Sequence, residues 1–132
     1  MASQRPMKFG LMNLFPYADE RGPEQLFKEA LEEIILAEEL GFDSVWLAEH
    51  HFSRYSIMPN PLMMATAIAQ RTKRIRIGTA VVIAPLYDPL RLAEDIALAD
   101  CLSDGRIDIG YGRGYQPLED RALLLRKQTE IA

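Results

Sequence analysis

Trp46-Leu47-Ala48-Glu49-His50-His51-Phe52 follows a hydrophobic run that starts at Phe42, and it contains both histidines of the chain. The hydrophobic residues suit a mostly buried strand, which then gives way abruptly to a carboxylate and two imidazoles. In α/β proteins, active sites lie just beyond the carboxyl ends of parallel strands. The stretch therefore predicts an α/β fold with a chemical site where this strand ends.

The composition is that of a globular domain that acts on small molecules. The chain has 132 residues, of which 48% are hydrophobic, enough for the core of one domain. Its net charge is −4, its pI is about 5.2, and its 15 Lys and Arg residues are dispersed along the chain. A basic surface for nucleic acid is therefore not expected.

The N-terminus, the apolar runs and the cysteine content add further limits. Residues 1–6 show no structural pattern, so we expect a leader there and one domain over residues 7–132. The longest apolar run, Ala80–Leu86, is too short to span a bilayer, so we expect a cytoplasmic protein. The single cysteine, Cys101, excludes an internal disulfide and is expected to be a small packed side chain of a helix.

Strand and helix patterns alternate on both sides of the opening stretch. Asn60-Pro61 and Asp88-Pro89 each supply an N-cap and a first helical position, and Gly41 is suited to the end of a helix. With the strand of the opening stretch, the patterns predict strands at 8–15, 75–83 and 106–110, and helices at 23–40, 62–70, 90–102 and about 121–131.

The resulting order is βαβαβαβ with a trailing helix, and the spacing of the units suits right-handed parallel crossovers. Two architectures fit this order. One is a doubly wound sheet of four strands, and the other is the first half of an eight-stranded barrel. Periodicity does not distinguish between them.

The two histidines are the leading candidates for proton transfer. Imidazole titrates near neutral pH, and the neighbouring Glu49 could orient a ring. Adjacent residues of an extended strand point to opposite faces, so only one of His50 and His51 can face a pocket, and geometry leaves open which one. The alternative is a surface loop with two solvated histidines. No metal site is expected, because the pair lacks metalloprotease spacing and the chain has no third histidine.

Two further stretches lie at predicted strand ends. Gly110-Tyr111-Gly112-Arg113-Gly114 permits close backbone approach and positive φ, and Arg113 suits a phosphate or carboxylate. It lacks the dinucleotide-binding pattern, because Tyr115 stands where a third glycine is needed, and a flexible turn explains it equally well. Thr79-Ala80-Val81 has small residues beside which a planar ligand could lie, although a plain buried strand is favoured on the sequence alone.

Taken together, these stretches resemble the N-terminal part of luciferase-like flavin-dependent monooxygenases. The resemblance is ordered along the chain and covers most of residues 7–117. Its most specific part is Glu49-His50-His51 with the hydrophobic residues before it. The other matching segments are Met7–Gly10, Gly41–Phe52, Asn60-Pro61, Gly78–Ala80, Asp88-Pro89, Ser103–Arg106 and Gly112–Gly114.

The resemblance implies an eight-stranded βα barrel that binds reduced FMN, or a deazaflavin in some relatives, at the carboxyl ends of its strands. It implies a monooxygenase that uses O2 and a small organic substrate such as an aldehyde, with a flavin reductase as partner. By position, His50 is the acid/base residue and Arg113 lies near the phosphate. The cofactor-binding residues that the resemblance implies are Glu49, Ala80, Val81, Gly112, Arg113 and Tyr115, with an unusual cis peptide at Ala80–Val81.

The chain corresponds to about half of such a barrel. A sheet of about four strands exposes two edges and an apolar face, so we expect a homo-oligomer, and the family commonly dimerises through its second and third helices. Three functions stay open at this point: an FMN-dependent monooxygenase, a deazaflavin-dependent dehydrogenase of the same barrel family, and a non-catalytic flavin-binding or assembly fragment.

Overall fold

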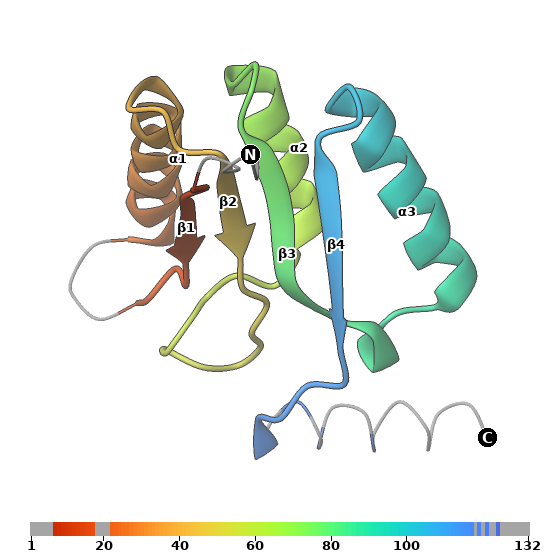
Figure 1. Ribbon diagram of the computed structural model, residues 1–132. Helices are drawn as coiled ribbons and strands as arrows, with labels where there is room; N and C mark the ends of the chain where they lie inside the picture. Colours follow the sequence, from red (N-terminus) through yellow and green to blue (C-terminus); the bar gives the residue numbers. More distant parts are fainter. Residues whose placement is uncertain (1–6, 18–21, 118, 120, 122–123, 125–132) are drawn as a thin grey trace.

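The computed structural model describes residues 7–17, 22–117, 119, 121 and 124. They form a four-stranded sheet with three α-helices beside it (Figure 1). Residues 1–6 and most of the helix predicted over 121–131 lie outside the described residues. In chain order the elements are β1 (Gly10–Asn13), α1 (Pro23–Glu39), β2 (Ser44–Leu47), α2 (Pro61–Arg71), β3 (Arg76–Ile83), the short 3₁₀ helix η1 (Ala84–Leu86), α3 (Pro89–Leu102) and β4 (Ile107–Gly112).

The strands lie in the order β1-β2-β3-β4, and each neighbouring pair is parallel. Figure 1 shows the strands side by side in chain order, with α1, α2 and α3 following one another along the sheet. This sequential order is that of a barrel segment, because a doubly wound sheet reverses its strand order at a switch point. Of the two architectures that fit the sequence, the structure has the half of a (β/α)8 barrel.

Local signals begin and end the helices where the sequence predicts. The side chain of Asn60 accepts a hydrogen bond from the backbone N–H of Met63 at 3.0 Å, and that of Asp88 accepts one from Leu90 at 3.0 Å. A proline follows each of these caps at the first helical position. Beyond the end of α1, Gly41 has a φ of +93°, which glycine adopts more readily than other residues.

The core lies between the sheet and the helices. Val45, Leu47 and Ile77 point from the strands to this side and are fully buried, and Ile34 of α1 and Ile68 of α2 pack against the same cluster. Burying each side chain of this size contributes about 1.5–3 kcal/mol. This layer therefore holds the sheet and the helices together.

The opposite face of the sheet is not covered by any described helix. Met12, Trp46 and Gly78 stand in register on β1, β2 and β3, and the Trp46 ring lies where a Cβ of Gly78 would be. Arg76 and Asp108 form an ion pair on this face, with 2.6 Å between a guanidinium nitrogen and a carboxylate oxygen. The open face thus combines an aromatic contact with a surface ion pair.

The first, second and fourth strands differ from their predicted extents, and the second ends at Leu47, before the Glu49–Phe52 part of the opening stretch. The first pairs only over Gly10–Asn13, because Phe15 adopts a φ of +51° and its ring turns into the core. The fourth continues to Gly112, two residues beyond the predicted end, because it pairs again with β3 after a register shift between Thr79 and Val82. The shift changes which residues of β3 and β4 face each other near the strand ends.

Cys101 is exposed, so the prediction that it is a packed side chain is wrong. The buried side of α3 is formed by Leu92 and Ala99. Cys101 follows Ala99 by two residues, a rotation of roughly 200° about the helix axis, which places it on another side.

Two charged side chains join the elements at the amino ends of the strands. The carboxylate of Glu38 on α1 accepts hydrogen bonds from the backbone N–H groups of 73, 74 and 75 at 2.7–2.8 Å. The guanidinium of Arg106 donates to the carbonyl of Ala69 at 2.9 Å and to that of Ser103 at 2.7 Å. Burial alone would raise the pKa of Glu38, but the three N–H donors and the charge of Arg106 hold this pKa below its usual value.

Glu38→Gln should lower the free energy of unfolding at pH 7 by about 1–2 kcal/mol, because a neutral amide accepts these bonds less strongly. The folded-state pKa of Glu38 is lowered, so the stability it confers is present above the ordinary value of 4.5 and is lost as pH falls below it. Urea unfolding at pH 7 and near pH 3.5 measures both effects.

The exposed Glu32 on the same helix provides the control, since its replacement by Gln should change stability little at either pH. If Glu38→Gln lowered the free energy of unfolding by the same amount at both pH values, the link between stability and the ionisation of Glu38 would be contradicted.

The backbones of β3 and β4 lie unusually close together at Gly110. A Cβ there would meet the backbone carbonyl oxygen of Thr79. The Thr79 hydroxyl also bonds to both backbone groups of Gly110, accepting from its N–H at 3.0 Å and donating to its carbonyl at 3.1 Å. Glycine is therefore required for close approach at this position.

Gly110→Ala should reduce the free energy of unfolding by about 1–3 kcal/mol, because backbone atoms must move to admit the methyl group. Gly22→Ala is the matched control, since a Cβ there meets nothing within 4 Å, and its loss should stay below about 1 kcal/mol. Chemical denaturation of both variants measures the two losses of unfolding free energy. Equal losses would show that β3 and β4 move apart at little cost to admit the methyl group.

Candidate active site

The carboxyl ends of the four strands and the loops after them surround a cavity of about 270 Å³. The strand arrows of Figure 1 point toward this edge of the sheet. The cavity is lined by every site residue that the resemblance implies, namely Glu49, His50, Ala80, Val81, Gly112, Arg113 and Tyr115. Ala48 and Gly114, from the stretches that the sequence singled out, also line it, together with residues that the sequence did not suggest: Met12, Leu14, Tyr55, Ile83 and Glu119.

His50 is held in this cavity by its backbone and by its ring. Its side chain is 8% exposed, and its backbone N–H donates to the carbonyl of Met58 at 2.9 Å. Nδ1 of the ring lies 3.2 Å from Oε1 of Glu119. The ring also meets Tyr55 and Tyr115 edge-on, with centroids 5.2 and 6.1 Å apart. The imidazole is therefore enclosed by two aromatic rings and one carboxylate.

Glu49 is buried, and both of its carboxylate oxygens have partners in the protein. Oε1 lies 2.8 Å from Nε2 of His51, and Oε2 accepts from the backbone N–H of Ile83 at 3.0 Å. Burial, followed by the Glu49 charge and a hydrogen bond to it, raises the pKa of Tyr87, so the hydroxyl stays protonated and donates to Glu49. Glu49 thus ties the end of β2 to the end of β3 and to the segment before α3.

The structure separates the two histidines. His50 lines the cavity, whereas His51 lies outside it with its side chain 19% exposed. β2 ends at Leu47, so both histidines belong to the loop after the strand, and strand alternation does not fix their directions. Of the two histidines, only His50 lines the cavity at the strand ends, and both line a separate hollow of about 440 Å³ in the loop after β2.

The ends of β3 and β4 form the opposite wall. The Ala80–Val81 peptide is cis, as the resemblance implies for this segment. A Cβ at Gly112 would meet a methyl group of Val81, so the glycine lets the two strands make a smooth apolar surface. Gly114 has a φ of +79° and makes a turn between its exposed neighbours Arg113 and Tyr115.

Glu119 contacts His50 and lines the cavity, and it is not among the site residues that the sequence suggested. It is 1% exposed although it lies outside the strands, and it reaches a histidine 69 residues earlier in the chain. The motif comparison stopped near Pro117. In the sequence, Glu119 is marked only by its position six residues after Arg113. That position indicates a contact with His50 only when the loop is known to lie beside this histidine.

The cavity combines a flat apolar wall with an exposed cation and an imidazole. A planar ring could lie against Ala80, Val81 and Gly112 while Arg113 binds an attached anion. The volume of about 270 Å³ is just below the roughly 300–1,000 Å³ of typical small-molecule sites. The residues present therefore fit the ring and phosphate of a flavin, with part of the cavity wall open.

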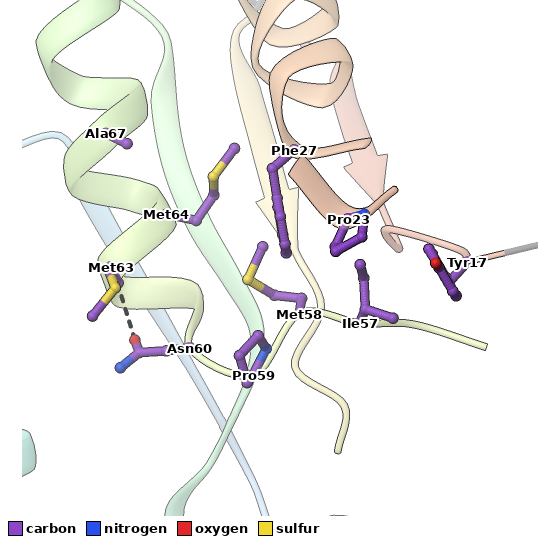
Figure 2. Close-up of a pocket in the computed structure, with 10 residues that line it drawn as sticks. All are labelled: Tyr17, Pro23, Phe27, Ile57, Met58, Pro59, Asn60, Met63, Met64 and Ala67. Atoms are coloured by element: carbon purple, nitrogen blue, oxygen red, sulfur yellow. Dashed lines mark hydrogen bonds between the residues drawn. The ribbon is translucent and has the colours of Figure 1, made fainter. Parts of the chain in front are cut away.

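A larger cavity of about 590 Å³ lies between α1 and α2 and is shown in Figure 2. Its wall is almost wholly apolar, and the methionines Met58 and Met64 extend toward Phe27. The side chain of Asn60 at its edge is already bonded to the N–H of Met63. The described residues that line this cavity include no histidine, carboxylate or cation, so the smaller polar cavity is the candidate active site.

Two negative findings apply to the described part of the chain. Among residues 7–17, 22–117, 119, 121 and 124, no three His, Cys, Asp or Glu side chains are grouped as metal ligands. In the same part, no helix has both the length and the apolar character needed to cross a membrane.

A family model described as luciferase-like monooxygenase matches residues 7–125. The match continues past residue 117, where the motif resemblance ended, and it includes Glu119. The oxygenase component of a flavin-dependent trigonelline monooxygenase from Acinetobacter baylyi is 36% identical over 114 residues, which are 86% of this chain and 32% of that protein. The alkanal monooxygenase alpha chain of Photorhabdus laumondii is 36% identical over 108 residues, 82% of this chain and 30% of that protein.

Solved structures show the same fold. The oxygenating constituent of 3,6-diketocamphane monooxygenase from Pseudomonas putida, in complex with FMN, matches with a TM-score of 0.84 and 28% identity, over 89% of this chain and 32% of that one. The coenzyme F420-dependent tetrahydromethanopterin reductase of Methanopyrus kandleri matches with a TM-score of 0.66 and 28% identity, over 86% of this chain and 29% of that one.

The chain spans about a third of the length of the curated relatives it matches. The family model nevertheless covers most of the chain, from β1 to beyond β4. The chain therefore belongs to the luciferase-like monooxygenase family.

Proposed function

We propose that this chain forms the flavin-binding half of a monooxygenase that uses reduced FMN and O2 on a small organic substrate such as an aldehyde. The observation that supports it most is the convergence of His50, the Ala80–Val81 segment and Arg113 on one cavity. These residues come from three separate strand ends. The FMN complex of the Pseudomonas putida relative supports the cofactor, and the alkanal monooxygenase of Photorhabdus laumondii supports the substrate class.

Each residue has a distinct role in this proposal. Reduced FMN, when bound, would supply the electrons that activate O2, and the activated oxygen would then oxidise the substrate. Arg113 pairs with the cofactor phosphate, and Ala80, Val81 and Gly112 form the surface beside the ring. Tyr115 and Glu49 complete the part of the wall that the described residues form. His50 accepts and returns a proton at its ring nitrogen as the general acid/base.

The partners follow from the same reasoning. The Acinetobacter baylyi relative is an oxygenase component, which supports a separate flavin reductase as the source of reduced cofactor. We propose a cytoplasmic location, where such a reductase and its nicotinamide donor are present. We also propose a homo-oligomer, because the uncovered sheet face and the outer edges of β1 and β4 are unfavourable in water.

A deazaflavin-dependent dehydrogenase is the second candidate. The Methanopyrus kandleri reductase, which depends on coenzyme F420, has the same arrangement of strands and helices and supports it. Tighter binding of a deazaflavin than of FMN would favour this candidate. Flavin binding without turnover would instead favour a non-catalytic binding or assembly fragment.

Arg113→Ala should weaken FMN binding by about 10-fold or more, because the loss of a charge-assisted hydrogen bond costs about 1.5–3 kcal/mol. Fluorescence titration of the whole chain with FMN and with riboflavin measures the effect. Riboflavin lacks the phosphate, so its affinity should change little. Arg91→Ala on α3, which removes an exposed arginine that pairs with Glu94, is the matched control.

No detectable flavin binding by the wild type would defeat the proposed function of this chain. If Arg113→Ala lost FMN and riboflavin affinity equally, the arginine would act on the flavin ring or on the stability of the fold, and not on the phosphate.

His50→Ala should reduce turnover by about 10²–10⁴-fold while flavin binding is retained, because general acid–base catalysis contributes this much. The measurement is aldehyde-dependent O2 consumption with FMN, NADH and a flavin reductase, with Arg91→Ala as the control. Unchanged turnover in His50→Ala would show that another group handles the proton.

A further inference from the structure

The two histidines are bound to carboxylates through opposite ring nitrogens. In His50 the nitrogen beside a carboxylate is Nδ1, 3.2 Å from Oε1 of Glu119. In His51 it is Nε2, 2.8 Å from Oε1 of Glu49. An ionised carboxylate only accepts hydrogen bonds, so the nitrogen that faces it must bear the proton. The two rings are thereby directed to opposite tautomers.

We propose that Glu119 is a positioning residue that keeps His50 in the tautomer protonated at Nδ1, so that a bare Nε2 is presented to the cavity as the proton acceptor. The proposal deepens the proposed function, since it states which nitrogen of His50 takes the proton. Its physical basis, however, is independent of any cofactor.

The carboxylate of Glu119 is itself held in a fixed orientation. It is 1% exposed, and its second oxygen, Oε2, accepts a hydrogen bond from the backbone N–H of Gln116 at 3.2 Å. This bond leaves Oε1 for the histidine. A buried carboxylate oxygen without a donor is costly, so the arrangement favours an N–H at Nδ1 of His50.

The remaining nitrogen of His50 is left for a ligand. Within the described residues, Nε2 has no hydrogen-bonding partner, and His50 lines the cavity. The other groups that face the ring are Tyr55 and Tyr115, whose ring edges enclose it. When Nε2 takes a proton, the ring becomes an imidazolium, and the Glu119 carboxylate stabilises that charge.

His51 gives an internal comparison within the same stretch. Its Nε2 is the nitrogen bound to a carboxylate, and the Nδ1 left over lies next to its own backbone, outside the cavity. The same pair of residue types thus leaves Nε2 unbonded in the histidine that lines the cavity and uses the other histidine to hold Glu49. The assignment of His50 as the proton acceptor then rests on the partners of its ring nitrogens as well as on its position.

The substitution Glu119→Gln tests the proposal without changing the shape of the side chain. The Gln oxygen must accept from the N–H of Gln116, so its NH2 group faces Nδ1 of His50. Nδ1 then has to be the acceptor, and the proton moves to Nε2. Glu49→Gln is the matched control, because its oxygen is needed by the N–H of Ile83 and its NH2 group then faces His51.

The tautomers are read from ¹H–¹⁵N correlation spectra of the imidazole rings, at a pH at which both rings are neutral and without flavin. The chain has two histidines, so His51→Asn assigns both signals. In the wild type we expect His50 protonated at Nδ1 and His51 at Nε2. Glu119→Gln should reverse the pattern of His50 alone, and Glu49→Gln that of His51 alone.

Any wild-type pattern for His50 other than Nδ1–H with a bare Nε2 overturns the proposal. An unchanged His50 pattern in Glu119→Gln also overturns it. If that variant failed to fold, the wild-type pattern would still decide. Because no flavin is present, failure of FMN to bind would defeat the proposed function and leave this result intact. In the active protein, Glu119→Gln should lower turnover by about 10²-fold or more, since Nε2 can no longer accept a proton.

Discussion

The buried carboxylate of Glu49 is the interaction on which the site depends. It faces Nε2 of His51 and accepts hydrogen bonds from the N–H of Ile83 and the hydroxyl of Tyr87, and so joins the ends of two strands and the start of a helix segment. His50 is the next residue in the chain, and its own backbone is tied to Met58. The position of the imidazole therefore follows from contacts made by its neighbours. Such a buried charge is stable only because each of its oxygens has a donor.

Stability and chemistry occupy opposite ends of the strands. At the amino ends, Glu38 and Arg106 bind backbone groups of neighbouring elements and have no part in the cavity. At the carboxyl ends, the side chains that line the cavity lie in loops or at the last strand positions. This division is general among βα barrels, where the loops at the carboxyl ends change with function and the amino ends preserve the fold. It allows the charges of one end to be altered with little direct effect on the other.

Much of the fold could be predicted because its signals are local. The caps at Asn60 and Asp88, and the hydrophobic period of each helix, act within a few residues and agree with the structure. Periodicity could not choose between a doubly wound sheet and a barrel segment, because the choice depends on which strands pair. The family resemblance predicted the half-barrel, and the strand order confirms it. In the site, the contact between His50 and Glu119 spans 69 residues and has no periodic signal. Cys101 was misplaced because a helix rich in Leu and Ala does not mark its buried side clearly.

Trp46 adds an optical property to this arrangement. It is the one tryptophan of the chain, and its ring lies over Gly78 on the sheet face that no described helix covers, with its indole N–H bonded to Ser44 at 3.0 Å. The emission of an indole depends on the polarity around it. Any polypeptide that covers this face would remove water from the ring and shift its fluorescence toward shorter wavelengths. The chain therefore contains its own reporter of whether the inner surface of the half-barrel is exposed or covered.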